Sequence, residues 1–384
     1  MFKKIAYLFK KDLMLSVSLA AAIISLFITP PSERLLHDID WKTLATLFML
    51  LSVLEGFKKE NIFRPLLQRT GRLGTIRGLS TFFVFSVFFS SMFVTNDVSL
   101  IIFVPLTIIL FRAGGKEKYT VPVLVLENIA AVRGSLLTPF GSPQNLFLFS
   151  QSGVTAPNFM LRMLPLWLFS AGLLFIFIQI LYHKDLHEKI VIEENEFSEP
   201  WKPEQKRTRI VYITLFIIII ATIVTRTRFW PFVTLFVFLA LLIFDRRILI
   251  RTDYVLLLTF LCFFVFSSSI AANPAISNFL KTHVAEKEYW WSILLSQVVS
   301  NVPASIILWP FTTNLTALLY GLDSAGLVSI IGSLASVINY RLYAREYPGR
   351  ALYFMKWFEI ISLAFFAIIV LPQYFLRGFL AVYN

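Results

Sequence analysis

Two short polar stretches interrupt long apolar runs and carry side chains that can bind an ion. They are Thr95-Asn96-Asp97, inside residues 76–112, and Ser300-Asn301, inside residues 288–320. Where a helix is interrupted, backbone groups are freed from helical bonding, and the N-terminus of the next half-helix favours an anion. The freed carbonyls can also coordinate Na⁺. We therefore expect these two stretches, called the tips below, to form a binding site for a small ion.

Two further interruptions combine glycine with serine. They are Gly141-Ser142 in the apolar run 121–150 and Gly332-Ser333 in the run 323–343, and they are called the breaks below. Prolines at 139 and 143 make helix interruption expected at the first break, whereas the second break has no matching proline. One alternative is that the glycines only let helices approach closely and that the tip asparagines only bond helices together. We favour a binding site, because these residues recur in register in both halves.

Three ionisable side chains within apolar segments are candidates for ion coupling: Asp97, Glu127 and Arg133. Asp97 follows Asn96 in the first tip, where the second tip has Val302. It can accept a proton or hold a cation, and an equally weighted alternative is that it caps the following helix. Glu127 and Arg133 are six residues apart and do not share a helix face. Arg133 is expected to offset an anionic ligand or to pair with Asp97.

The sequence does not indicate enzymatic chemistry. A catalytic pair within the apolar runs, such as two aspartates or serine with lysine, is absent from the sequence, and Cys262 is its one cysteine. His183 and His187 share a helix face, but without a third ligand a solvated helix end is the favoured interpretation. We expect no enzyme, no metal site and no cofactor, with Na⁺ as a candidate coupling ion.

The composition requires a membrane. Of the 384 residues, 57% are hydrophobic and only 15% are charged, which is too little polar surface for a soluble domain. Apolar runs of helical length recur, and the alternation of a β-barrel strand is absent. This predicts an all-α polytopic membrane protein and argues against a soluble enzyme or nucleic-acid binder. Nine spans are expected, at about 13–29, 41–57, 121–150, 158–182, 208–225, 229–245, 253–270, 323–343 and 352–376.

The segments 76–112 and 288–320 are predicted to be re-entrant helical hairpins in addition to these spans. Polar backbone at mid-depth is tolerated only where it is buried in protein or lines a cavity. The formal net charge of +12 has a membrane explanation as well. With the N-terminus inside, 26 Lys and Arg lie on the cytoplasmic side against 7 outside. We expect the cytoplasmic membrane as the location, with the linker 183–207 inside and Asn384 outside.

The two halves of the chain, residues 1–182 and 208–384, share three anchors in the same order. TNDVSLIIFVP at 95–105 matches SNVPASIILWP at 300–310, and TPFGS at 138–142 matches SIIGS at 329–333. The third and weakest anchor pairs DWKTLATLF at 40–48 with DYVLLLTFL at 253–261. Five spans separate matching elements of the two halves. Because the number of membrane crossings between them is odd, the second copy has the opposite orientation in the membrane. An inverted-topology repeat usually occurs in a secondary transporter with its site at the midplane.

These motifs resemble the signature elements of the ion-transporter superfamily. They are the segment at 95–105, TPFGSPQNLFLF at 138–149, SNVPAS at 300–305 and IGSLAS at 331–336. That superfamily includes arsenite permeases, citrate-transporter-like and dicarboxylate carriers, and certain sodium/proton antiporters. The resemblance implies an elevator mechanism and a site that includes the unwound segments Gly141-Ser142-Pro143-Gln144-Asn145 and Gly332-Ser333-Leu334-Ala335-Ser336. In the dicarboxylate carriers the tip motif ends with a threonine, which neither tip of this chain has. The first tip, with its Asn-Asp pair, is more similar to the arsenite-permease branch.

The leading hypothesis is a secondary active transporter for a small anion. The candidate substrates are an inorganic oxyanion, a metalloid species and a carboxylate. Transport is expected to be coupled to Na⁺, H⁺ or membrane potential. The alternative is a sodium/proton antiporter in which Asp97 titrates and no anion binds. The expected partners are the small-molecule anion and the lipid bilayer, without nucleic acid. The sequence leaves the oligomeric state open, with a homodimer as one option.

Overall fold

The computed structural model describes residues 13–30, 33–60, 74–184, 188–189 and 203–379. Within these residues the regular structure is helical, apart from one isolated bridge between Thr75 and Lys189. Seven helices in this part of the chain are long and apolar enough to cross a membrane. The protein is therefore an all-α polytopic membrane protein, as predicted. The count of nine spans stays a prediction.

The first half contains α2 (Leu13–Ile28), α3 (Glu33–Asp38), α4 (Trp41–Lys59), α6 (Ile76–Val94), α7 (Asn96–Ala113), η2 (Glu117–Tyr119), α8 (Thr120–Gly134), η3 (Ser135–Leu137), α9 (Pro143–Ser152) and α10 (Ala156–Leu181). The second half contains α11 (Pro203–Thr225), α12 (Trp230–Arg251), α13 (Tyr254–Ala272), α14 (Pro274–Val284), α15 (Glu288–Val299), α16 (Asn301–Leu308), η5 (Trp309–Phe311), α17 (Leu315–Val328), η6 (Ile330–Gly332), α18 (Leu334–Glu346) and α19 (Ala351–Phe379).

Several boundaries differ from the sequence-based expectation, and two of them change how a segment is interpreted. The helix α17 begins at Leu315, inside the segment 288–320 that was expected to be one hairpin, because the Asn314 side chain caps it by accepting from the Ala317 N–H at 2.9 Å. The helix α11 begins at Pro203, inside the expected linker 183–207. Residues 185–187 and 190–202 of that linker lie outside the described part of the chain.

The two predicted hairpins differ in length. The helices α6 and α7 have 19 and 18 residues, so they are roughly 28 Å and 27 Å long and of sufficient length to cross the hydrocarbon core. The helices α15 and α16 have 12 and 8 residues and are roughly 18 Å and 12 Å long, too short to cross it. Re-entrant insertion therefore stays a prediction, and the second pair is the one whose length fits it.

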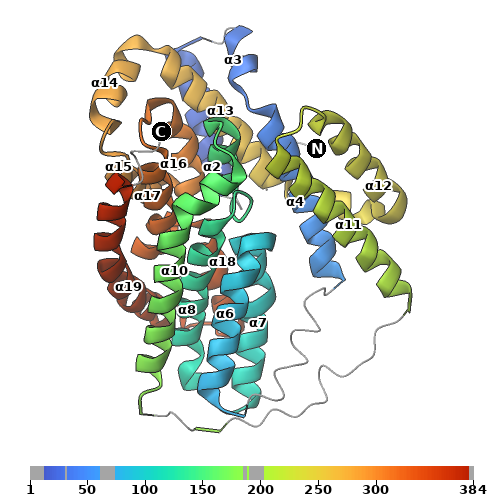
Figure 1. Cartoon of the computed structure of the whole chain (residues 1–384), viewed down its shortest axis with the longest axis vertical. Coiled ribbons are helices and arrows are strands. Elements are labelled where there is room, and N and C mark those ends of the chain that lie inside the picture. The colour runs from blue at the N-terminus through green and yellow to red at the C-terminus, as the bar shows by residue number, and fades with distance from the viewer. Residues whose placement is uncertain (1–12, 31–32, 61–73, 185–187, 190–202, 380–384) are drawn as a thin grey trace.

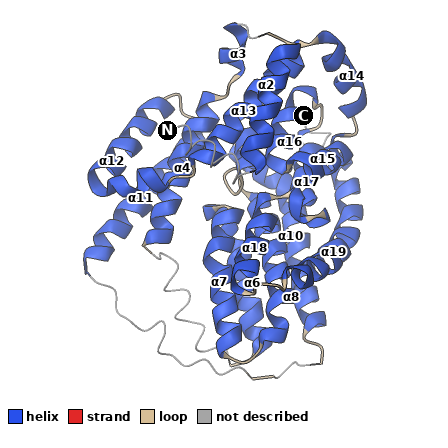
Figure 2. Cartoon of the chain, turned by 180° about the vertical axis from the view of Figure 1, so that it is seen from behind, coloured by secondary structure: helices blue, strands red, loops and turns tan. Residues whose placement is uncertain are grey.

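The helices form two groups (Figures 1 and 2). The flanking group, α4 with α11 and α12, stands to one side of a bundle that contains α6, α7, α8, α10, α18 and α19. Contacts between the halves are reciprocal: α2 packs on α13 and α12 packs on α4, while α7 packs on α18 and α16 packs on α9. Within the bundle α8 is completely buried, so it lies at the centre.

Candidate functional site

The two tips share an unusual backbone conformation. Thr95 has φ 69° and ψ 156°, and Ser300 has φ 70° and ψ 161°. A side chain at positive φ with extended ψ is strained, at a cost of order 1–3 kcal/mol, and such residues cluster at functional sites. Each tip residue ends one helix and precedes another, which begins at Asn96 or Asn301. The chain thus folds the same strained turn at two positions that the sequence had paired.

The two breaks also share their conformation. Ser142 and Ser333 are both extended, and each is followed directly by a helix, α9 or α18. The glycines before them are required sterically, because an added Cβ would lie 2.2 Å from the Ser135 carbonyl oxygen at Gly141 and 2.0 Å from the Ala325 carbonyl oxygen at Gly332. The structure thus interrupts both helices, including the second one, which has no proline to signal it.

Matching hydrogen bonds brace the two breaks. The Asn145 amide donates from Nδ2 to the Ser135 carbonyl at 3.2 Å, and the Ser336 hydroxyl donates to the Gly326 carbonyl at 3.2 Å. The donors and acceptors of these two bonds are related by the same offset, 191 residues, as Gly141 and Gly332. In the first half the tip also meets its break, since the Asn96 N–H donates to the Gly141 carbonyl at 3.2 Å.

Two adjoining cavities lie between these elements and the helices α4 and α13. The larger, the first tip cavity, has a volume of about 580 Å³ and is lined by Leu47, Leu50, Leu51, Glu55, Lys58, Thr95, Asp97, Val98, Ile101, Ser142, Pro143, Leu146, Ile250, Arg251, Thr252, Asp253, Tyr254, Val255, Leu256, Leu334 and Ile338. The second tip cavity, of about 280 Å³, is lined by Asp253, Val255, Leu256, Thr259, Ser300, Val302, Pro303, Ile331, Leu334, Val337, Ile338 and Arg341. Five residues line both cavities, so both tips border one connected region.

Only some of the predicted site residues line these cavities: Thr95, Asp97, Ser142, Pro143, Ser300 and Leu334. The others pack behind them: Asn96, Asn301, Gly141, Gln144, Asn145, Gly332 and Ser333. The two tip asparagines are only 3% and 2% exposed. Their side chains bond to backbone instead: Asn96 Oδ1 accepts from the Asp97 N–H at 2.9 Å, and Asn301 Nδ2 donates to the Leu322 carbonyl at 3.5 Å.

Charges of both signs surround the cavities. Lys58, Arg251 and Arg341 supply positive charge, and Lys58 forms an ion pair with Glu55 at 3.0 Å. Asp97 and Asp253 supply negative charge. Three buried polar atoms at the tips and breaks have no hydrogen-bond partner in the structure: Asp97 Oδ1, Ser300 Oγ and Ser333 Oγ. Buried polar atoms are nearly always bonded, and Asp97 and Ser300 line the cavities, so these two residues offer unbonded atoms to a ligand.

The other two coupling candidates lie elsewhere. Glu127 accepts a hydrogen bond from Thr107 at 2.5 Å, and Arg133 donates from Nη2 to Ser324 Oγ at 2.9 Å. Both side chains are fully buried in α8, and neither lines a tip cavity. Arg133 thus contacts the second half of the chain, whereas Asp97, its expected partner, lines the first tip cavity.

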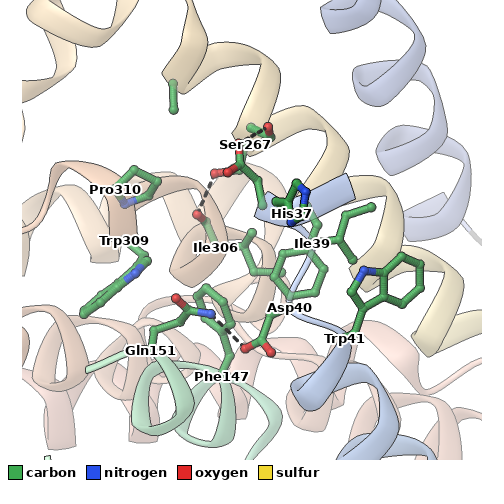
Figure 3. Close-up of a pocket in the computed structure, with 14 residues that line it drawn as sticks. His37, Ile39, Asp40, Trp41, Phe147, Gln151, Ser267, Ile306, Trp309 and Pro310 are labelled. Carbon is green, nitrogen blue, oxygen red and sulfur yellow. Dashed lines mark hydrogen bonds between the residues drawn. The ribbon is translucent and has the colours of Figure 1, made fainter. Parts of the chain in front are cut away.

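A third cavity, of about 470 Å³, lies toward the other end of α4 and is shown in Figure 3. It is lined by His37, Asp38, Ile39, Asp40, Trp41, Phe147, Gln151, Phe264, Ser267, Ser268, Ala271, Ile306, Trp309 and Pro310. In it Gln151 Nε2 donates to Asp40 Oδ2 at 2.8 Å, which ties the end of α9 to the start of α4. We call this contact the α4–α9 tie. Sequence reasoning missed it, because no motif marks residues that meet only in the fold.

The sequence model of the family described as citrate transporter matches residues 5–335 of this chain. The chain belongs to the citrate transporter family. It is 32% identical over 314 residues to the inner membrane protein YbiR of Escherichia coli strain K12, covering 79% of this chain and 80% of that protein. It is 30% identical over 334 residues to the uncharacterized transporter MJ0456 of Methanocaldococcus jannaschii, covering 86% of this chain and 88% of that one. The resemblance found in the sequence is confirmed, and this family member is a multi-pass membrane transporter.

Proposed function

We propose that the chain is a secondary active transporter for a small anion and that the anion binds where the tips and breaks border the tip cavities. The observation that carries this proposal is that both tips and the first break line this connected region. Leu334, the residue directly after the second break, lines both cavities. Four helices begin beside it, α7, α9, α16 and α18. Their N-termini favour negative charge, which supports an anion as the substrate. We propose transport without catalysis.

The substrate class that we favour is a small carboxylate, with an inorganic oxyanion or a metalloid species as the other candidates. The family description names citrate, which supports a carboxylate. The unbonded hydroxyl of Ser300, which lines the second tip cavity, is suited to an oxygen-rich ligand. Lys58, Arg251 and Arg341 line the cavities and are suited to attract an anion toward the tips.

We further propose that the bundle moves against the flanking helices in an elevator-type alternating-access cycle. Cavities lie toward both ends of α4, a helix of 19 residues and roughly 28 Å, and only the tip cavities include the tips. The matched backbone conformations of the two halves support an inverted-topology repeat of residues 1–182 and 208–384. By the charge bias of the sequence, the tip cavities face the cytoplasm in this state.

A sodium/proton antiporter is the second candidate, and one observation favours it. Asp97 is a cavity-lining carboxylate whose Oδ1 has no hydrogen-bond partner, and Asp253 lines the same cavity. Two carboxylates facing one cavity suit a cation or an exchanged proton. In this case Asp97 would carry the coupled proton and no anion would bind.

Transport by the purified protein in proteoliposomes distinguishes the two candidates. We expect uptake of radiolabelled citrate, phosphate or arsenite that depends on an imposed Na⁺, H⁺ or electrical gradient. Thermal unfolding with the same anions is the parallel binding measurement, because a ligand of the folded state raises its stability. Proton movement driven by Na⁺ with no anion bound or transported would reject the anion transporter and establish the antiporter.

A further inference from the structure

A buried pair of opposite charges lies behind the first break. Arg133 of α8 and Asp323 of α17 are 0% and 1% exposed, and neither lines any of the three cavities described above. Arg133 Nη2 donates to Ser324, the residue that follows Asp323, so the guanidinium is held near Asp323 without a direct ion pair. The anion site proposed above makes no use of this pair, and the sequence did not single out Asp323.

Asp323 is attached to the first break by a hydrogen bond. Gln144 Nε2 donates to Asp323 Oδ1 at 3.0 Å. Gln144 lies in the first turn of α9, directly after Ser142 and Pro143, which line the first tip cavity. A side chain of the second half of the protein therefore holds the first turn of a helix whose N-terminus faces the proposed anion.

Arg133 is held on the other side by a polar cluster. Its Nη2 donates to Ser324 Oγ at 2.9 Å. In the orientation of the Gln373 amide that satisfies its neighbours, the amide oxygen lies 3.1 Å from both Nη atoms of Arg133, and its nitrogen donates to Ser324 Oγ and Tyr289. The cluster thus holds the guanidinium at Ser324, the residue next to Asp323, without neutralising it, since Ser324, Gln373 and Tyr289 carry no charge.

An isolated charge in this position would be costly, and the two charges offset each other. Removing one partner of a buried pair leaves the other uncompensated, whereas replacing both is often tolerated.

Arg133 and Ser324 are 191 residues apart, the offset that relates Gly141 to Gly332, so this hydrogen bond joins counterparts of the proposed repeat. The counterpart of Gln144 is Ala335, which has no polar side chain. Only the first break is therefore braced by a side chain of this kind.

We propose that Asp323 and Arg133 are positioning residues for the substrate site: Asp323 fixes the first turn of α9 through Gln144, and Arg133 balances the charge that lets Asp323 remain a strong acceptor. This inference rests on the proposed anion site for its effect on transport, but not for its effect on the structure. The pair contacts no substrate. It acts only through the orientation of the Ser142-Pro143-Gln144 turn.

The charge balance is tested by thermal unfolding of purified variants, which needs no substrate. Arg133→Met leaves Asp323 uncompensated and should lower the unfolding temperature strongly. Arg133→Met combined with Asp323→Asn removes both charges and keeps an acceptor for Gln144, so it should unfold closer to wild type than the single variant. A double variant no more stable than Arg133→Met would overturn the charge-balance half of the proposal.

The positioning is tested with Gln144→Ala, which leaves both charges in place. We expect the KM for radiolabelled citrate in proteoliposomes to rise about tenfold, with a maximal rate within about twofold of wild type, because a hydrogen bond to a charged group is lost. The matched control is Gln179→Ala in α10, an amide that also bonds to a charged group, accepting from Arg77 Nη1 at 3.2 Å, and that lines neither tip cavity. An unchanged KM in Gln144→Ala would overturn the positioning role.

A second measurement separates this result from failure of the proposed function. In a Cys262→Ser background, a cysteine introduced by Leu146→Cys lines the first tip cavity. Adding Gln144→Ala should raise its rate of labelling by a maleimide several-fold, whereas adding Gln179→Ala should not. If the wild-type protein transports no citrate but this labelling difference appears, citrate is not the substrate and the positioning role of Asp323 is still supported. Equal labelling in both variants would refute the positioning whatever the substrate is.

Discussion

Replacing Gly141 with alanine would place a methyl carbon 2.2 Å from the carbonyl oxygen of Ser135. Ordinary contacts of a Cβ begin near 3.4 Å, so the break would have to open by about 1 Å. The neighbour is backbone and not a flexible side-chain end, and overpacking of this kind costs about 1–3 kcal/mol. Opening the break would also disturb the Asn96 N–H bond to the Gly141 carbonyl.

We therefore expect Gly141→Ala to lower the thermal unfolding temperature and to reduce transport more than its stability loss explains. The matched control is Gly172→Ala in α10, where no atom lies within 4 Å of the added Cβ and the substitution should stabilise the helix by about 0.5–1 kcal/mol. The assay is thermal unfolding of both purified variants followed by proteoliposome uptake at equal amounts of folded protein. If Gly141→Ala unfolds and transports as Gly172→Ala does, the close approach at the first break is not a constraint on function.

The remaining predictions concern the tips. Thr95→Gly and Ser300→Gly should each relieve backbone strain of about 1–3 kcal/mol, because positive φ is strained for residues other than glycine. The net gain in the free energy of unfolding is smaller than this, since glycine adds entropy to the unfolded chain. Chemical unfolding measures the net change, and destabilisation would contradict the strain. Asn96→Ala and Asn301→Ala should cost about 1 kcal/mol of stability and reduce uptake by disturbing the backbone of the tips, since each side chain bonds to backbone and lines neither cavity. Full uptake by either variant would make these tips structural. Asp97→Asn should bind the anion, judged by thermal shift, but lose the dependence of its transport on pH or Na⁺; an unchanged dependence would exclude Asp97 as the coupling group.

The sequence predicted the features that leave a local signal. Apolar runs of helical length gave the fold class, and Pro139, Pro143 and the glycines marked the breaks. The start of α17 was missed because its signal, the cap at Asn314, lies within one apolar run that also contains α16. Sequence reasoning also expected Asn96 and Asn301 to offer their amides to a ligand, yet both side chains turn to backbone carbonyl or N–H groups.

What the sequence could not supply is contact between distant segments. Asp323 meets Gln144 across 179 residues, and Asp40 meets Gln151 across 111. Neither contact follows from spacing, because each depends on how the two halves pack. An acidic residue within an apolar run was the one available signal for Asp323, and its partner could not be inferred from it.

The complete burial of α8 has a consequence for how the protein enters the membrane. Arg133 is fully buried in the last turn of α8, and an arginine within a lone helix opposes insertion, by about 2.5–3.5 kcal/mol if it lies at the helix centre. Its partner Ser324 is synthesised 191 residues later, which at normal rates of translation is a delay of roughly 10–40 s. During that interval α8 has no α17 or α19 to cover it. Biogenesis of this protein is therefore expected to retain the first half at the insertion machinery, or under a membrane chaperone, until the second half arrives.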